Sequence, residues 1–458
     1  SALIAASGVA FAQKGETVKI AFMDPLSGPF ANVGQNQLKS WQFAAGHFSG
    51  KNAAGVKFEV VGFDNKGLVE AAQRAYAKLP AYHAFFGRVG QSALDLSERL
   101  IKLAPMEANR VFYANSGSEA NDTVVKLLWL LAEAEGQPHR RLLLSRKNAY
   151  HGMTIMTASL TGKDYVKSAS GLPLSEVRHL TCPHFWREAQ PGETELDFSA
   201  RLALELEQTI RNTGPERIAG FFAEPVLGAG GVIPPPEGYF QAIQPVLKKY
   251  GIPLIADEVI CGFGRTGEFW GSIKYGMQPD MVVASKVITA GFFPMGAIIL
   301  SPEMTARIEK AAAKYEELPT GFTTGAHPVG CAIALEVLDQ VVDRGGFKNV
   351  QTVAPAFQKA LAGMANHPMV GEARGVGLMG ALEMVADKEK KTPFAGHLDV
   401  SERVAKQALK NGLICRPLGA SIVLAPPFII TEQQIAELFT ILRRTLDEVY
   451  AGLGQKAA

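Results

Sequence analysis

A single lysine stands at the end of a short apolar stretch. Residues 280–286 read Asp-Met-Val-Val-Ala-Ser-Lys, and the glycine-bearing segment VITAGFFPMG follows. A compact apolar run predicts a buried strand whose carboxyl end presents the amine of Lys286, and open α/β sheets bind ligands at such ends. In a desolvated pocket the pKa of a lysine is lowered, so Lys286 would be competent to form a Schiff base. A surface lysine in a loop is the simpler interpretation of this stretch taken alone.

Two acids end a second apolar run, which reads Leu254-Ile255-Ala256-Asp257-Glu258-Val259. A buried carboxylate needs a cation or hydrogen-bond donors to offset its desolvation. A protonated pyridine nitrogen would supply both, and Asp257 would keep that ring cationic, as an electron sink for a carbanion. The alternative is a structural salt bridge, for example with Arg265 in the following GFGRTG.

A small-residue turn links a strand-like segment, RVFYANSG, to a predicted helix that begins at Ser118. The free backbone N–H groups, the helix dipole and the Ser118 hydroxyl would form a cradle for an anion, most naturally a phosphate. An ordinary serine N-cap is the alternative.

Two further side chains complete the set. Tyr150 lies in the loop NAYHG after the strand-like LLLSR, where an aromatic ring could stack on a planar cofactor or simply pack. Arg416 ends a short apolar run in GLICRP, and a guanidinium is the natural bidentate partner of a substrate carboxylate, although exposed arginines are usually solvated. Phosphate cradle, ring stacker, pyridinium partner and Schiff-base lysine together are the parts of a pyridoxal phosphate (PLP) enzyme.

The order of predicted elements indicates how these residues are positioned. Strand-like and helical segments alternate from residue 68 to about 324, which predicts an α/β class with a mainly parallel sheet covered by helices. A smaller α+β portion follows and closes with a helix that starts at a Thr431–Gln434 capping box. The apolar stripe predicted for that helix is Ile435, Leu438, Phe439, Leu442, Leu446 and Val449.

Composition excludes several function classes. The chain has 46 basic and 44 acidic residues, a balance that suits neither nucleic acid nor an anionic membrane. Its four cysteines are far apart and form no metal-ligand spacing, so we expect no metal and buried free thiols in a reducing compartment. No run is long enough for a transmembrane helix.

The N-terminal segment differs in character from the rest of the chain. Residues 1–12, SALIAASGVAFA, resemble the end of a signal peptide, with an unstructured terminus as the alternative. Residues 13–66, with predicted strands at 17–23 and 56–63, resemble the opening of periplasmic binding proteins for branched-chain amino acids. Those proteins need two complete lobes, so we do not expect a working receptor. The signal-like remnant points to export, but the thiols and the predicted PLP chemistry favour the cytoplasm.

Residues from about 68 to 452 resemble the class III aminotransferases of the ω-transaminase kind, which have the type I fold of PLP enzymes. That resemblance implies a PLP-binding large domain over 67–325 and a smaller C-terminal domain with its connecting helix over 326–458. The stretches that carry it are NSGSEAND, YHG, EPVLGAGGVIPPPEGYF, IADEVICGFGRTGEFWG, SKVITAGFFPMGA, GFTTGAHPVGCAIAL and LICRP.

The resemblance also implies roles for individual residues. Lys286 would carry PLP and shuttle the proton, and Asp257 would pair with the pyridinium nitrogen. Tyr150 and Val259 would pack on opposite ring faces, with Glu224 near the ring hydroxyl. The remaining implied residues are Gly117 and Ser118 at the phosphate, Phe322 and Thr323 completing the phosphate site of a neighbouring subunit, Arg416 at the substrate carboxylate, and Phe85 or Phe86 and Trp270 as pocket walls.

The implied activity is a ping-pong transamination from an amine or ω-amino acid to a 2-oxo acid such as pyruvate, in a homodimer or a dimer of dimers. Because a foreign-looking segment stands before residue 67, a PLP-binding fusion with impaired substrate binding is one alternative. Other class III activities, 2-oxoglutarate-linked or decarboxylating, and an amino-acid binding module are the others.

Overall fold

The computed structural model describes residues 17–20, 57–60, 65–85, 87–168 and 170–454. Two compact units divide them: the large unit, Lys66–Thr352, and the C-terminal unit, which contains residues 353–454 and two short strands near the N-terminus. The domain limits expected at residues 12, 66 and 325 stay predictions, whereas the compact units divide next to Lys66 and after Thr352.

The large unit is built on one seven-stranded sheet. Strand β9 runs antiparallel to its neighbours β3 and β8, and the other neighbouring pairs are parallel. The α/β class with a mainly parallel sheet is therefore confirmed. In spatial order the strands are β3 (Arg110–Ala114), β9 (Gly296–Leu300), β8 (Met281–Ala284), β7 (Leu254–Asp257), β6 (Ile218–Ala223), β4 (Leu142–Arg146) and β5 (Val177–Leu180).

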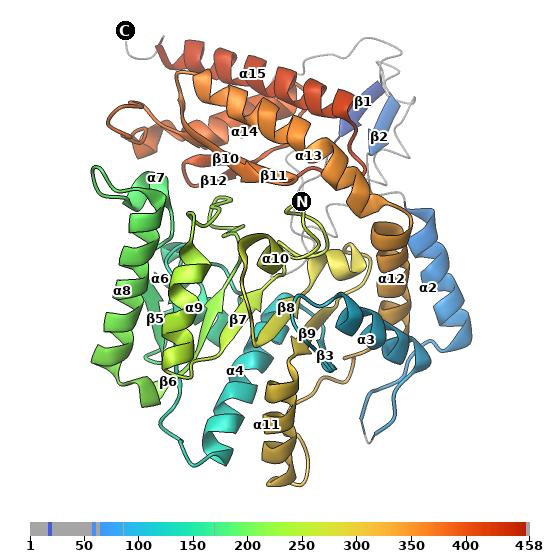
Figure 1. The fold of residues 1–458 in the computed structure, drawn as a ribbon. Coiled ribbons are helices and arrows are strands. Elements are labelled where there is room, and N and C mark those ends of the chain that lie inside the picture. The colour runs from blue at the N-terminus through green and yellow to red at the C-terminus, as the bar shows by residue number, and fades with distance from the viewer. Residues whose placement is uncertain (1–16, 21–56, 61–64, 86, 169, 455–458) are drawn as a thin grey trace. The chain divides into compact units, whose positions relative to one another are not determined.

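Helices cover both faces of this sheet (Figure 1). Along β8, Val282 and Ala284 belong to one hydrophobic cluster and Met281 and Val283 to another, as the two-residue period of a strand requires. The first cluster includes side chains of α3 (Gln91–Leu103), α8 (Glu195–Thr213), α9 (Tyr239–Lys249) and α12 (Pro328–Leu338). The second includes those of α4 (Gly117–Ala134) and α11 (Pro302–Ala313).

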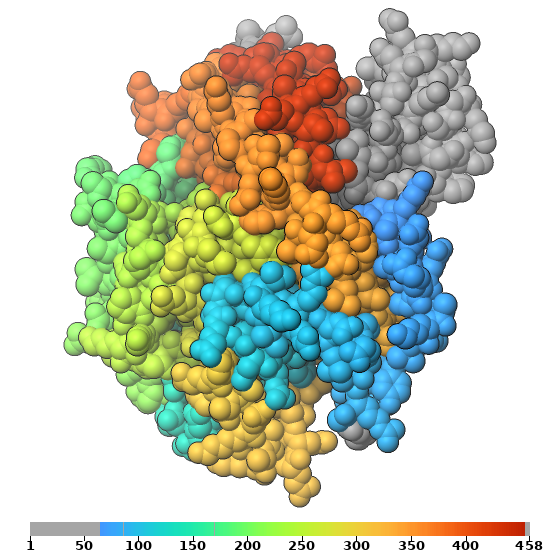
Figure 2. Space-filling view, turned by 45° about the vertical axis from the view of Figure 1, so that its right-hand side comes forward, coloured from blue at the N-terminus to red at the C-terminus, as the bar shows by residue number. Residues whose placement is uncertain are grey.

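Among its described residues, the large unit has eight further helical elements. They are α2 (Lys66–Lys78), α5 (Ile155–Leu160), α6 (Asp164–Ser168), α7 (Phe185–Glu188), α10 (Gly271–Tyr275), the 3-10 turns η1 (Pro215–Arg217) and η2 (Lys286–Thr289), and the π-helical turn η3 (Asp339–Asp343). In the space-filling view of Figure 2, the light-blue segment that contains α3 forms part of the surface of the large unit.

The C-terminal unit holds a four-stranded antiparallel sheet in the order β10 (Val370–Val376), β11 (Met379–Met384), β13 (Ser421–Leu424) and β12 (Arg416–Leu418). Its helices are α13 (Gly346–Gly363), which starts within the large unit, α14 (Val400–Lys410) and α15 (Glu432–Gly454), with 3-10 turns η4 (Met364–Asn366) and η5 (Gly396–Leu398). Both strands expected near the N-terminus, at 17–23 and 56–63, have counterparts in β1 (Thr17–Ile20) and β2 (Lys57–Val60), which pair in parallel.

Helix α15 agrees with its prediction in detail. The backbone N–H of Thr431 donates to Gln434 Oε1 at 3.0 Å, and that of Gln434 donates to Thr431 Oγ1 at 3.2 Å, which is the expected capping box. Its predicted stripe is buried throughout. Among the helices that the structure describes, none combines the length and apolar character needed to cross a membrane.

Candidate active site

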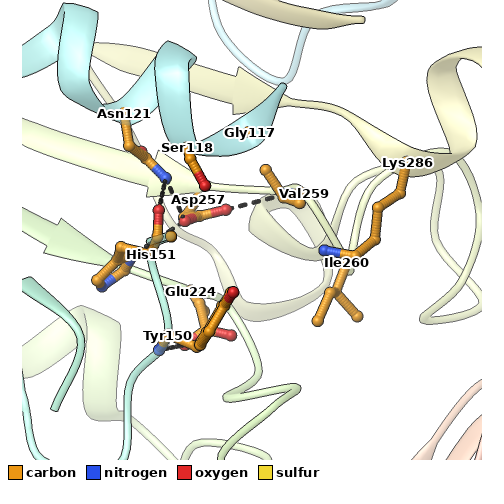
Figure 3. Close-up of a pocket in the computed structure, with 11 residues that line it drawn as sticks. Gly117, Ser118, Asn121, Tyr150, His151, Glu224, Asp257, Val259, Ile260 and Lys286 are labelled. Atoms are coloured by element: carbon orange, nitrogen blue, oxygen red, sulfur yellow. Dashed lines mark hydrogen bonds and ion pairs between the residues drawn. The ribbon is translucent and has the colours of Figure 1, made fainter. Parts of the chain in front are cut away.

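A cavity opens at the carboxyl ends of the parallel strands of the large unit. The residues that follow β4, β6, β7 and β8 reach it, and the first turn of α4 closes one side. Its lining consists of Gly117, Ser118, Asn121, Tyr150, His151, Gly152, Glu224, Asp257, Val259, Ile260 and Lys286 (Figure 3). This placement is the one expected for a ligand site in an open α/β sheet.

Lys286 enters the cavity from the end of β8. The four residues of that strand are buried, which confirms the predicted buried strand, and Lys286 begins the turn η2 with φ of 46°. Ser285, the residue before it, fixes the turn by donating its hydroxyl to the carbonyl of Met295 at 2.7 Å. In Figure 3 the amine of Lys286 points into the cavity from the side opposite Asn121 and His151.

Asp257 is buried at the end of β7 and is surrounded by donors. His151 Nδ1 and Asn121 Nδ2 both lie 2.8 Å from its Oδ2, and the backbone N–H of Val259 donates to its Oδ1 at 3.1 Å. These contacts fix the orientation of the carboxylate. A carboxylate offers about four acceptor positions, so one stays available to a donor in the cavity.

His151 and Asn121 were not predicted as site residues from the sequence. They lie 106 and 136 positions from Asp257, so no local spacing could have shown the contacts. Asn121 also donates to the carbonyl of His151 at 2.9 Å, which joins the three residues into one buried network. Asn121 Oδ1 and His151 Nε2 have no hydrogen-bond partner among the described residues.

The neighbouring acid, Glu258, has a different role. Its carboxylate accepts the backbone N–H groups of Gly271 and Ser272 and the Ser272 hydroxyl, and so caps the start of α10. Burial raises the pKa of Glu258 to about 7, against the opposing effect of these donors. Of the two acids that end this run, only Asp257 lines the cavity.

The first turn of α4 supplies an anion cradle. Ser116 is the N-cap and accepts the N–H of Glu119 at 3.1 Å, so Gly117 and Ser118 occupy the first turn. N–H groups of a first turn have no partner within their helix and are available to a ligand. A Cβ added to Gly117 would lie 3.0 Å from Val259 Cγ2, so a larger residue would crowd the cavity.

The loop that carries Tyr150 is docked by two contacts. The backbone N–H of Tyr150 donates to Glu224 Oε1 at 3.0 Å, and that of Met153 donates to Ser118 Oγ at 3.2 Å. Glu224 Oε2 accepts the N–H of Gly228 at 3.0 Å. Burial raises the pKa of the Glu224 carboxyl, while the nearby His151 and the donor of Tyr150 lower it.

Gly152 of this loop packs closely against Ser118 and Thr157, and a substitution there tests this packing. Its φ is 137°, and an added Cβ would lie 2.6 Å from both Ser118 Oγ and Thr157 Oγ1. Gly152→Ala is therefore expected to lower the free energy of unfolding by about 3 kcal/mol, combining backbone strain with overpacking. Gly136→Ala is the control, because Gly136 also has a positive φ but open space around it. It should cost about 1 kcal/mol, and equal losses in denaturant titrations of the two variants would contradict the packing described.

The other predicted residues occupy different places. Phe322 is half-buried and Thr323 exposed, in the segment before α12, and a Cβ added to Gly321 of that segment would lie 2.9 Å from the ring of Phe85. Phe86 lies outside the described residues. Trp270 is fully buried in the core, where its indole donates to the carbonyl of Leu103, and it does not line the cavity.

Arg416 begins β12 of the C-terminal unit and is half-buried. Its predicted contact with a substrate carboxylate stays a prediction.

Comparisons with known proteins agree with this geometry. The sequence profile of the family "Aminotransferase class-III" matches residues 53–446. An aminotransferase from Vibrio fluvialis, solved in a PMP-bound form, is 56% identical, with a TM-score of 0.83 over 89% of this chain and 88% of that one. An omega-aminotransferase from Paracoccus denitrificans is also 56% identical, with a TM-score of 0.84 over 89% of each chain.

A curated relative, gamma aminobutyrate transaminase 1 of Solanum lycopersicum, is 42% identical over 86% of this chain and 77% of its own. A transaminase solved with L-Ala is 44% identical, with a TM-score of 0.84 over 86% of this chain and 93% of that one. From the family match and these identities, the chain belongs to the class-III aminotransferases.

Proposed function

We propose that this protein is a PLP-dependent transaminase of the ω-amine type. It would move an amino group from a primary amine or ω-amino acid to a 2-oxo acid such as pyruvate, so that the donor leaves as a ketone or aldehyde and the acceptor as an amino acid. The observation that carries the proposal is the convergence of the Lys286 amine, the Asp257 carboxylate and the first turn of α4 on one cavity. The solved relatives with bound PMP or PLP support the choice of cofactor.

The residues present fit PLP. The α4 turn can take the phosphate, and the acceptor position left on Asp257 can take the N–H of a pyridinium. Asn121 Oδ1, buried without a partner among the described residues, offers a further acceptor at this end of the cavity.

When bound, PLP supplies an electron sink for the carbon that loses its proton. Lys286 would hold the cofactor and then move the proton at that carbon with its amine. Asp257 would keep the ring nitrogen protonated, held by His151 and Asn121. Tyr150 and Val259 would exclude water from the two ring faces, and Glu224 would orient the ring hydroxyl.

The proposal also assigns residues to the substrate and to a second subunit. Arg416 would bind the carboxylate of an amino or keto acid, with Phe85 and Phe86 as walls of the substrate pocket. The exposed position of Thr323 beside Phe322 is compatible with completing the phosphate site of a second copy in a homodimer or a dimer of dimers. The transaminase solved with L-Ala supports an amino acid as one substrate.

Two further parts of the proposal concern the N-terminal segment and the compartment. Residues 13–66 would be a binding-protein-like fragment fused before the aminotransferase, although the family match already begins at residue 53. The cytoplasm is the compartment proposed, because Cys261, Cys331 and Cys415 are buried and form no disulfide among the described residues.

The absorbance of the purified protein with PLP tests the function. A visible band that falls on adding a primary amine or γ-aminobutyrate, and returns on adding pyruvate, is expected for the complete cycle. A band that responds to no donor would point to an intact cofactor site with impaired substrate binding. If no band forms, the proposed function is wrong.

A further inference from the structure

Arg146, the last residue of β4, is fully buried. Its Nη2 donates to the backbone carbonyl of Glu224 at 2.6 Å, and its guanidinium lies over the ring of Tyr239, 5.8 Å from the centroid. Its Nε and Nη1 atoms have no hydrogen-bond partner among the described residues. A guanidinium stays charged in proteins, and a buried charge with few partners is costly. Because burying this charge is energetically unfavourable, we expect a role of Arg146 beyond packing.

The position of this charge indicates the role. Strands β4 and β6 are parallel neighbours, so Arg146 and Glu224 meet at the same edge of the sheet, on the side of the cavity. Glu224 joins two loops, because one oxygen accepts the N–H of Tyr150 and the other that of Gly228. An ionised carboxylate accepts strongly at both oxygens, whereas the oxygen that carries a proton is a donor and a much weaker acceptor.

Gly228 belongs to a loop that is itself packed against the cavity. A Cβ added to Gly228 would lie 2.6 Å from Ile260 Cδ1, and Ile260 lines the cavity. Glu224 therefore fixes Tyr150 directly and supports Ile260 through Gly228.

Several charged and titratable groups act on Glu224. Burial raises the pKa of its carboxyl most strongly, and Asp257 raises it further. His151 and Arg146 lower the pKa, as does the N–H of Tyr150. The buried thiol of Cys261 also lies close enough for its own pKa to respond to Glu224. Among the groups that favour the ionised form, Arg146 is the one that also holds the Glu224 backbone.

We propose that Arg146 is a positioning residue of the active site, which acts through the backbone and the charge of Glu224 to hold the Tyr150 and Gly228 loops in place. The inference deepens the proposed function, because those loops would face the cofactor. It predicts an effect that a purely structural arginine would not have, namely one that depends on pH and requires the Glu224 carboxylate.

The test compares wild type with Arg146→Met, Glu224→Gln and the double variant, and uses Arg146→Lys as the conservative change. Arg140→Met is the matched control, because Arg140 donates to the backbone carbonyl of Ile218 at the start of β6, whereas Glu224 follows the other end of that strand. Two quantities are measured across neutral to alkaline pH: the unfolding temperature of the cofactor-free protein and the dissociation constant of PLP.

The expected signs follow from linkage. Without Arg146 the pKa of Glu224 in the folded state is higher. Between the pKa of Glu224 in the unfolded chain and its pKa in the folded variant, the folded protein binds more protons than the unfolded chain. The free energy of unfolding therefore falls as the pH rises through that window. The unfolding temperature of Arg146→Met should therefore fall further below wild type as the pH rises. The dissociation constant of PLP should be about tenfold higher than wild type near neutral pH, the effect of losing a hydrogen bond to a charged group. That ratio should shrink in alkaline buffer, where Glu224 ionises again.

In the Glu224→Gln background both pH dependences should vanish, and Arg146→Lys should restore most of the wild-type profile. Arg140→Met should change stability by the same amount at all pH values. The proposal would be overturned if Arg146→Met lowered the unfolding temperature and weakened PLP binding equally at all pH values, and if Glu224→Gln did not change these effects. If Arg146→Met does not fold, a profile of Arg146→Lys that is the same in both backgrounds overturns it instead. If the wild-type protein does not bind PLP, the proposed function is wrong, but the unfolding temperatures of the cofactor-free variants still test the role of Arg146.

Discussion

Replacing Lys286 with alanine is expected to lower the turnover number for transamination by about 10⁴-fold, the upper end of what a positioned acid–base group contributes. The side chain reaches the cavity from the end of β8, and its amine is the group proposed to move the proton. The α4 turn and Asp257 are unchanged in this variant, so PLP should still bind, with a higher dissociation constant and an altered absorbance band. Steady-state rates with an amine donor and pyruvate, together with a PLP titration, measure both effects.

A control separates loss of this amine from loss of any lysine. Lys274 is exposed on α10, and Lys274→Ala should leave the turnover number and PLP binding unchanged. Turnover of Lys286→Ala within tenfold of wild type would show that another group moves the proton.

Asp257→Asn should lower the turnover number by about 10²- to 10³-fold, which corresponds to removing one partner of a buried hydrogen-bonded charge pair. The amide keeps the shape of the carboxylate but not its charge, so the ring nitrogen would lose its proton. An amide nitrogen at the Oδ2 position would also face the donors of His151 and Asn121. The amide is therefore expected to place its oxygen toward those donors and its nitrogen toward Val259.

Asp280→Asn is the matched control for this substitution. Asp280 is an acid one residue before β8, and it accepts the N–H of Leu254 at 2.7 Å at the far edge of the sheet. Its amide should change stability but not turnover. If Asp257→Asn and Asp280→Asn reduce turnover equally, the charge of Asp257 has no part in catalysis.

Local patterns in the sequence were sufficient to predict most of the elements that carry the site. An apolar run that stops at Lys286, a second one that stops at Asp257 and a small-residue turn at Gly117 each have a local signature, and each lies where the signature placed it. These residues converge because parallel strands end at a common edge.

Contacts between distant residues left no such signature. The contacts of His151 and Asn121 with Asp257 depend on three chain segments meeting, and Arg146 read simply as the end of a strand. For Trp270 the sequence suggested a contact that the structure does not show. Its position at the end of the GFGRTGEFWG motif suggested a pocket wall, whereas its side chain is buried in the core. Aromatic residues carry more buried area than any others, so position near a motif does not distinguish lining from packing.

The order of strands in the large sheet has a consequence for how the protein is made. The cavity takes residues from Gly117 to Lys286, and β9, which lies between β3 and β8, is completed only at Leu300. During synthesis from the N-terminus, Lys286 is the last lining residue to leave the ribosome. Strand β9, which joins β8 to β3, is made later still. A nascent chain that ends before residue 300 therefore lacks the strand between β3 and β8, and we expect PLP to stabilise the protein fully only after that strand has been added.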